Sequence, residues 1–141
     1  FRRVLFRSNP FAIVYESFSG NKREGSVKSV KSLIQGGKFK GIVVNSIVNG
    51  AAIKQVIISQ DSDDGTFEDK ALKLKFTGRY AVITLNDRSE LQDLYIGKGS
   101  DFSFKNWSVK VVNRQSASLS LKMVKKLCTI TSTEKFSISH P

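Results

Sequence analysis

Apolar and polar side chains alternate in short stretches along most of this chain, and that period of two restricts the fold more than any other feature. The clearest stretches are residues 71–76 and 117–123, in which apolar residues alternate with lysines or serines. Because successive side chains of a strand point to opposite faces, this alternation predicts strands with one buried face. Turn residues recur about every ten positions. We therefore expect a mainly β fold, an antiparallel β-sandwich or barrel of about seven or eight short strands with one N-terminal α-helix.

Asn49-Gly50 is the strongest turn signal in the sequence. Both central residues of a type I′ turn need a positive φ, which asparagine and glycine adopt readily. A two-residue loop would pair Val48 with Ala51, Ser46 with Ile53, Val44 with Gln55 and Ile42 with Ile57. The hairpin should lie centrally in a sheet because both of its faces are partly apolar, one with Ile42, Val44, Val48, Ile53 and Ile57, the other with Val43, Ile47, Val56 and Ile58.

Residues 26–35 form the helix candidate. Val27, Val30 and Ile34 recur at helical spacing. Ser26 can cap the N-terminus of such a helix, and Gly36 stands where a left-handed C-terminal cap belongs. Residues 11–18 are rich in β-branched and aromatic residues and favour a strand, although the preceding Pro10 would equally suit the first turn of a helix.

The rest of the chain divides into further short strands. We expect a hairpin of residues 71–76 and 80–85 around a turn at 77–79, a short strand at 94–96, a strand at 102–112 with a bulge near Asn106, a strand at 117–123, and a final hairpin of residues 127–131 and 136–139. The core expected from this pattern comprises Val30, Ile34, Ile42, Val44, Ile53, Ile57, Leu72, Leu74, Phe76, Val82, Val109, Val111, Leu119 and Leu121.

The first eight residues differ in kind from the rest. In one reading frame they match the translation of a common sequencing adapter, so we expect residues 1–8 to be an artefact that replaces the true N-terminus. Without their three arginines the formal net charge falls from +11 to +8. Residues 9–141 are then a single β-rich domain, and the adapter points to an environmental or draft assembly, in which viral sequences are frequent.

Groups for nucleophilic catalysis are scarce. The single histidine, His140, is the penultimate residue, where chain ends usually fray. The single cysteine, Cys128, excludes an internal disulfide and a cysteine-based zinc site, and its alternating segment favours a small core residue. Residues 97–100 have the wrong order for a phosphate-binding loop. The sequence therefore predicts that the protein is not an enzyme and takes no cofactor.

Acidic residues crowd one loop, which we expect at residues 60–70. Oxygen ligands at this density could hold calcium, although the spacing departs from that of an EF-hand. A solvated hairpin loop is the simpler interpretation, and we favour it over a metal site. The candidate metal ligands are Asp61, Asp63, Asp64, Glu68 and Asp69.

Basic residues concentrate at 22–40 and 98–126, on either side of this acidic region. If the two stretches meet in space, they would form a patch that attracts phosphate or another anion. Aromatic residues interleaved with lysines are typical of single-strand binding, but alternation alone would turn the aromatics inward. The candidate residues for binding nucleic acid or another anion are Lys28, Lys31, Lys38, Lys40, Lys98, Lys105, Trp107 and Lys110.

Two functional hypotheses remain. The first is a non-catalytic structural, assembly or interaction module, such as a virion or complex component, with protein partners or self-assembly. The second is a nucleic-acid-binding β-barrel that uses the two basic stretches. Neither involves a membrane, because the apolar runs are too short to span one. We expect a soluble protein that is cytoplasmic or associated with a virion.

Overall fold

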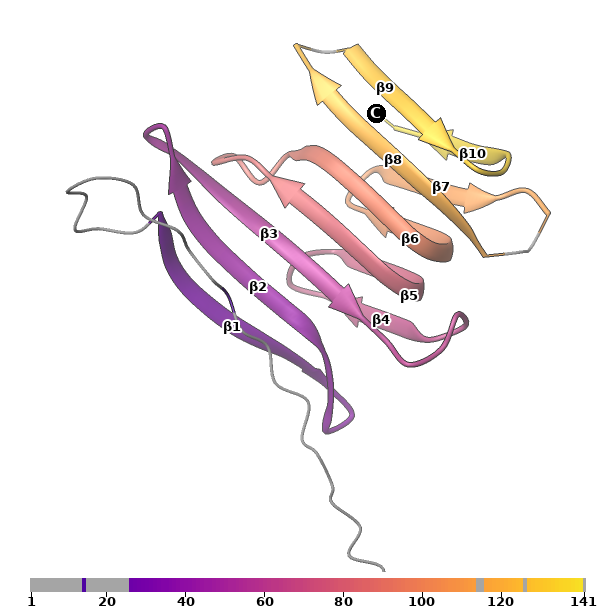
Figure 1. Cartoon of the computed structure of the whole chain (residues 1–141), viewed down its shortest axis with the longest axis horizontal. Helices are drawn as coiled ribbons and strands as arrows, with labels where there is room; N and C mark the ends of the chain where they lie inside the picture. The colour runs from indigo at the N-terminus through magenta and orange to yellow at the C-terminus, as the bar shows by residue number, and fades with distance from the viewer. Residues whose placement is uncertain (1–13, 15–25, 114–115, 126, 141) are drawn as a thin grey trace, which may run out of the picture.

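The computed structural model describes residues 14, 26–113, 116–125 and 127–140. Ten strands and no helix occur in these residues (Figure 1). The strands are β1 (Val27–Gln35), β2 (Lys38–Val48), β3 (Ala51–Ser59), β4 (Thr66–Asp69), β5 (Leu74–Leu85), β6 (Leu91–Phe104), β7 (Trp107–Val111), β8 (Ala117–Val124), β9 (Leu127–Ser132) and β10 (Phe136–Ser139).

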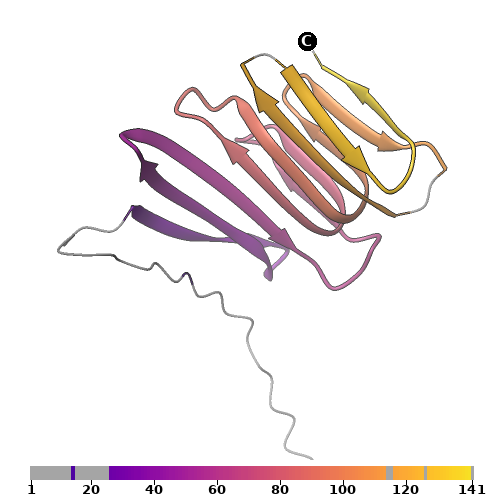
Figure 2. The same ribbon diagram turned by 45° about the horizontal axis from the view of Figure 1, so that its top comes forward.

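All ten strands belong to one antiparallel sheet with the order β1-β2-β3-β5-β6-β7-β10, and β4, β8 and β9 branch from this path. The long strands β5 and β6 each take part in two groups of paired strands. Their sections at 80–85 and 91–96 lie among β3 and β8, whereas their sections at 74–77 and 101–104 lie among β4 and β7. Figure 2 shows the second group lying behind the first. The antiparallel β class is therefore confirmed, as one open sheet that bends back on itself.

Two glycines permit the bend. A Cβ atom built on Gly78 would lie 2.4 Å from the carbonyl oxygen of Lys98, and one on Gly99 would lie 2.8 Å from the ring of Phe76. Neither distance is tolerable for a side chain, so β5 and β6 can approach this closely only where both lack one. The turn predicted at residues 77–79 is accordingly wrong: β5 continues through it, and the two predicted strands do not pair with each other.

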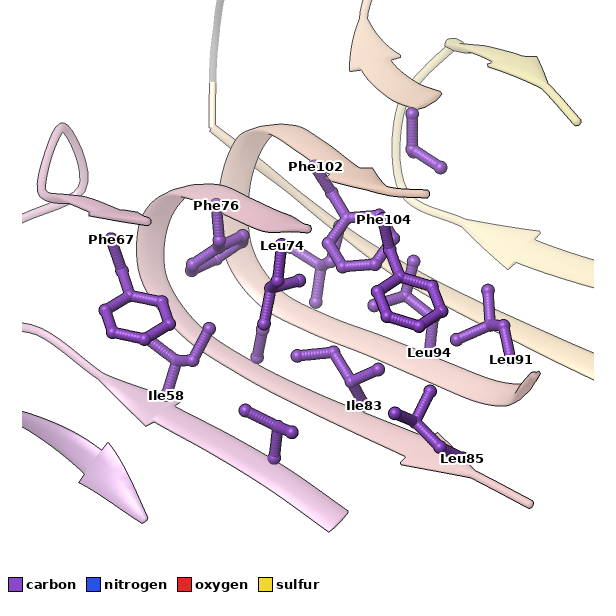
Figure 3. Packing of buried hydrophobic residues seen from close by; sticks show 14 of the residues in the cluster. Ile58, Phe67, Leu74, Phe76, Ile83, Leu85, Leu91, Leu94, Phe102 and Phe104 are labelled. Atoms are coloured by element: carbon purple, nitrogen blue, oxygen red, sulfur yellow. The ribbon is translucent and has the colours of Figure 1, made fainter. Parts of the chain in front are cut away.

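The main core lies between the two halves of the bent sheet (Figure 3). Phe67, Phe76, Phe102 and Phe104 of one half pack against the aliphatic side chains of the other, and Phe76 and Phe102 are fully buried. The members of the predicted core that are buried are Ile42, Val44, Leu74, Phe76, Val109, Val111, Leu119 and Leu121.

In β2, β3 and residues 80–85 of β5 the prediction chose the wrong face for the main core. Val43, Val56 and Ile58 face the second half of the sheet, whereas Ile53, Ile57 and Val82 are only half-buried. Ile42 and Val44 are buried but lie outside the main cluster. Both faces of these strands are apolar, and alternation separates two faces without saying which one the second half covers.

The predicted helix at residues 26–35 is also wrong, because this segment is β1. It pairs with β2 through partners such as Val30 with Val44. Gly36 and Gly37 have φ values of 59° and 71° and form the two-residue turn between these strands, so Gly36 is not a helix cap. Val30 and Ile34 are exposed by 46% and 59% on β1, an edge strand of which only Leu33 is buried in the main core.

The Asn49-Gly50 hairpin is confirmed with all four predicted pairs in register. Asn49 has a φ of 52° and Gly50 a φ of 81°. Near Asn106 the chain makes a hairpin instead of the expected bulge, since Phe104 pairs with Trp107 and Lys105 has a φ of 51°. β9 and β10 exist but pair with β8 and β7 instead of with each other.

The strand predicted at residues 11–18 lies outside the described residues, apart from Val14, which is in neither a helix nor a strand. The proposed artefact at residues 1–8 also lies outside them. A search of the described residues for a helix that could cross a membrane finds none.

Candidate functional site

Two tyrosines form an exposed aromatic pair on the outer face of the sheet. The rings of Tyr80 on β5 and Tyr95 on β6 lie edge to face with their centroids 6.2 Å apart. The side chains are exposed by 38% and 46%, although their sequence neighbours Ala81, Leu94 and Ile96 are buried. A tyrosine combines a large apolar ring with a polar tip, which suits it to contact a ligand at the surface.

Gly97 makes room for this pair. A Cβ atom at Gly97 would lie 3.1 Å from Cδ1 of Tyr80 and 3.5 Å from Cε1 of Tyr95. The carbonyl oxygen of Gly97 accepts a hydrogen bond of 2.5 Å from the hydroxyl of Ser118 on β8. The backbone beneath the tyrosines is thus held to the next strand.

Polar and charged side chains surround the tyrosines because opposite partners in an antiparallel sheet share a face. Tyr95 pairs with Val82 on one side and Ser120 on the other, and Tyr80 pairs with Lys98. One step along the strands, Asp93 pairs with Thr84 and Lys122. We call this surface the tyrosine face and define it by Tyr80, Val82, Thr84, Asp93, Tyr95, Lys98, Ser120 and Lys122.

A charged cluster of Asp63, Arg79 and Lys98 adjoins the tyrosine face. Nε of Arg79 donates to Oδ1 of Asp63 at 2.8 Å, and Nζ of Lys98 lies 3.3 Å from Oδ2 of the same carboxylate. The hydroxyl of Ser116 lies 3.4 Å from that Oδ2 atom. The hydrogen bond from Arg79 is the largest cause that holds the pKa of Asp63 below its usual value, and Lys98 acts in the same direction.

Gln60 positions the loop that carries Asp63. Its side chain is 7% exposed, and Nε2 donates to the carbonyl oxygens of Gly65 and Gly78, both at 2.9 Å. Its Oε1 accepts a hydrogen bond of 2.9 Å from Nζ of Lys40. The loop after β3 is therefore fixed to the bend of β5, the strand that also provides Arg79 and Tyr80.

The predicted metal ligands do not converge. Asp63 is engaged by Arg79 and Lys98, and Oδ1 of Asp69 accepts a hydrogen bond from the backbone N–H of Leu72 at 3.0 Å. Asp61, Asp64 and Glu68 are exposed, and Glu68 lies on β4 instead of in a loop. Among the described residues no group of three or more histidine, cysteine or acidic side chains is placed to hold a metal.

The predicted basic site is dispersed over the molecule. Lys28 and Lys31 lie on the edge strand β1, Lys38 begins β2, and Lys40 is bound to Gln60. Lys105 lies in the β6–β7 turn, where it donates to the carbonyl oxygen of Ser89, and Lys110 on β7 lies 3.6 Å from Asp101. Of these residues, Lys98 alone belongs to the tyrosine face.

Trp107, His140 and Cys128 also lie apart from that face. The ring of Trp107 stacks on His140 with a centroid distance of 5.0 Å and packs against the core. Cys128 on β9 is exposed instead of in the core, which corrects the sequence-based expectation.

The tyrosines themselves were missed by the sequence reasoning. Alternation places Leu94 and Ile96 inside and therefore Tyr95 outside, so an aromatic residue on the polar side of a strand was the available signal.

A comparison with protein-family models matches residues 27–121, which run from β1 into β8, to the endo-acting ulvan lyase C-terminal domain. The chain belongs to this family. It is 39% identical over 100 residues to an endo-acting ulvan lyase of Formosa agariphila. The match covers 71% of this chain but only 12% of the lyase. No solved structure matches significantly.

Family membership overturns the functions predicted from the sequence. The chain is related to a domain of a polysaccharide-cleaving enzyme, so the structural or virion module and the nucleic-acid-binding alternative are both wrong. The expectation that the protein is not an enzyme is contradicted as well, because the matched family is named for an enzyme, the endo-acting ulvan lyase. Composition and strand periodicity are shared by many β domains, and nothing in them distinguished this family.

Proposed function

We propose that this chain is the part of a polysaccharide lyase that holds the polysaccharide, and that the tyrosine face is the surface on which the polymer lies. The observation that carries the proposal is an exposed tyrosine pair in a domain of the ulvan lyase family. The matched relative is named for cleaving ulvan, and the chain corresponds to a small share of that enzyme.

The chemistry of the tyrosine face supports a sugar polymer. Sugar rings present flat apolar C–H faces and rims of hydroxyl groups, and the two tyrosine rings offer apolar surface of similar size. The side chains of Thr84, Asp93 and Ser120 beside them can donate to or accept from hydroxyl groups. The rings lie over adjacent long strands of the sheet, so the contact surface is preformed and loses little conformational entropy on binding.

Charge supports an anionic polymer. Without the three arginines of residues 1–8 the chain has 20 lysines and arginines against 12 acidic residues, and Lys98 and Lys122 lie on the tyrosine face itself. Such a surface attracts a polyanion over several ångströms, with a strength that falls as salt rises. Ulvan is the first polymer to test, because the relative and the family are named for it.

Affinity electrophoresis in gels that contain ulvan, followed by titration calorimetry, tests the proposal. We expect the wild-type chain to be retarded, and Tyr95→Ala to lose about tenfold in affinity, or about 1.4 kcal/mol. Tyr95→Phe should retain most binding because it keeps the ring. Leu127→Ala is the control, since it removes a side chain that is 72% exposed on β9 and away from the tyrosines. A wild-type chain that ulvan does not retard, or a Tyr95→Ala variant that binds as well as wild type, would contradict the proposal.

A further inference from the structure

We infer that Arg79 and Lys98 form a binding site for the anionic group of a sugar bound on Tyr80, and that Asp63 is an internal carboxylate with which this group competes. The polysaccharide as ligand rests on the proposed function. The anion site itself rests on the geometry of the charged cluster.

The charged cluster is positive and open to solvent. Two cationic side chains share one carboxylate, so the cluster keeps a net positive charge of one. The side chains of Arg79 and Lys98 are 51% and 58% exposed and accessible to a ligand. The hydrogen bond to Asp63 uses Nε of Arg79, which is one of five N–H donors on a guanidinium group. A guanidinium group binds carboxylate and sulfate groups in a directed, often bidentate manner.

The charged cluster lies beside Tyr80. Lys98 is the register partner of Tyr80, and Cβ atoms of such partners lie about 5 Å apart. Arg79 precedes Tyr80 at a register shift that interrupts the regular alternation of faces. Its side chain shares the carboxylate of Asp63 with Lys98. A sugar ring that contacts Tyr80 would thus carry its substituents toward these cations, so the aromatic contact and the ionic contact can be made by the same residue of the polymer.

Asp63 is the carboxylate with which an anionic ligand would compete. Its carboxylate has the chemistry of a uronate, and it engages both cations in the free protein. Gln60 fixes the loop on which it lies, so Asp63 is held in place instead of reaching the cations by chance. An anionic ligand must share or displace these contacts, which makes Asp63 a residue that lowers affinity and favours strongly anionic polymers.

Opposite effects of neighbouring variants test the inference. Arg79→Gln and Lys98→Gln should each weaken the binding of ulvan about fivefold, which corresponds to the upper end of the energies measured for exposed ion pairs. Asp63→Asn should strengthen the binding of ulvan by a similar factor. Lys110→Gln is the matched control, because it breaks another exposed lysine–aspartate pair, with Asp101, on β7. Thermal melting of each variant checks that the fold is intact. A purely structural role for Asp63 predicts weaker or equal binding in Asp63→Asn and would overturn the inference.

Small anions provide a readout that does not depend on the polysaccharide. The Arg79 Nε–Hε signal in the NMR spectrum should shift on titration with sodium sulfate and with sodium glucuronate, compared with sodium chloride at equal ionic strength, and it should shift more in Asp63→Asn. The two probes distinguish a sulfate group from a carboxylate as the ligand. An Arg79 signal that responds to neither would overturn the anion site.

The two proposals fail in different ways. If Tyr95→Ala loses ulvan binding while the Arg79, Lys98 and Asp63 variants bind as well as wild type, the proposed function stands and the anion site is ruled out. Absence of ulvan binding by the wild-type chain would remove the proposed function, while a titrating Arg79 signal would still support the anion site.

Discussion

Nε2 of Gln60 donates a 2.9 Å hydrogen bond to the carbonyl oxygen of Gly78 and so ties the loop after β3 to the bend of β5. Gln60 is the one buried polar side chain found among the described residues. It anchors both the fold and the proposed site, because the same loop carries Asp63 and the same bend precedes Arg79 and Tyr80.

Replacement of Gln60 should therefore be costly. Gln60→Ala removes the donor to Gly65 and Gly78 and the acceptor for Lys40, which leaves a buried carbonyl group without its partner. We expect the free energy of unfolding to fall by about 2 kcal/mol, measured by urea denaturation. Gln92→Ala on β6, where the glutamine is only half-buried, is the control and should change it by less than about 0.5 kcal/mol. Equal losses in both variants would show that Gln60 has no anchoring role.

The bend itself makes a second prediction, for which the chain offers a matched pair of glycines. Gly78 and Gly50 both have positive φ values, 153° and 81°, so alanine is strained at either position. Only at Gly78 would the new Cβ atom meet backbone atoms, 2.4 Å from the carbonyl oxygen of Lys98. We expect Gly50→Ala to cost about 1 kcal/mol of stability and Gly78→Ala about 3 kcal/mol or more, by the same denaturation measurement. Similar costs would mean that the close approach of β5 and β6 does not limit the fold.

The extent to which sequence determined this fold is clearest in β2 and β3. Local turn chemistry settled the Asn49-Gly50 hairpin and its register, because a two-residue turn leaves no freedom in the pairing. The face that meets the core depends on where the second half of the sheet folds, which is a long-range property set by the bend at Gly78 and Gly99. The apolar residues of β1 are compatible with the spacing of a helix and with that of a strand. The Gly36-Gly37 turn makes this segment a strand, because it pairs β1 with β2 in a hairpin.

The same limits apply to the site. Charge density along the sequence identified Lys98 and Asp63 as candidates but assigned them to different sites, a basic patch and a metal loop. Only the fold brings their side chains to 3.3 Å. The tyrosines lie 15 residues apart on neighbouring strands, and their contact depends on the pairing of β5 with β6.

Adjacent isoleucines on β3 test which face carries the core. Ile58 is fully buried between the two halves of the sheet, whereas Ile57 lies on the outer face and is half-buried. Ile58→Ala should lower the free energy of unfolding by about 3 to 4 kcal/mol, and Ile57→Ala by about 1 kcal/mol. The two variants remove the same atoms from neighbouring positions, so hydrogen-exchange or urea measurements compare the faces directly. A larger loss for Ile57→Ala would restore the face predicted from the sequence.

The pairing of Asp63 with Arg79 and Lys98 makes stability depend on acidic pH. The pKa of Asp63 in the folded protein is held below its ordinary value of 3.8, chiefly by the hydrogen bond from Arg79, so the folded state binds this proton less readily than the unfolded state. The stabilisation is therefore fully present above pH 3.8 and is lost as the pH falls through the lowered pKa. Asp63→Asn should be less stable than wild type at neutral pH, and the difference between their unfolding midpoints should narrow as the pH falls below that value. Arg79→Gln should show the same narrowing, because it removes the main cause of the shift, and the double variant should lose little more than either single one. The unfolding midpoints of wild type and Asp63→Asn could instead differ by the same amount from neutral pH to below the lowered pKa. That result would show that the ion pair does not stabilise the folded chain.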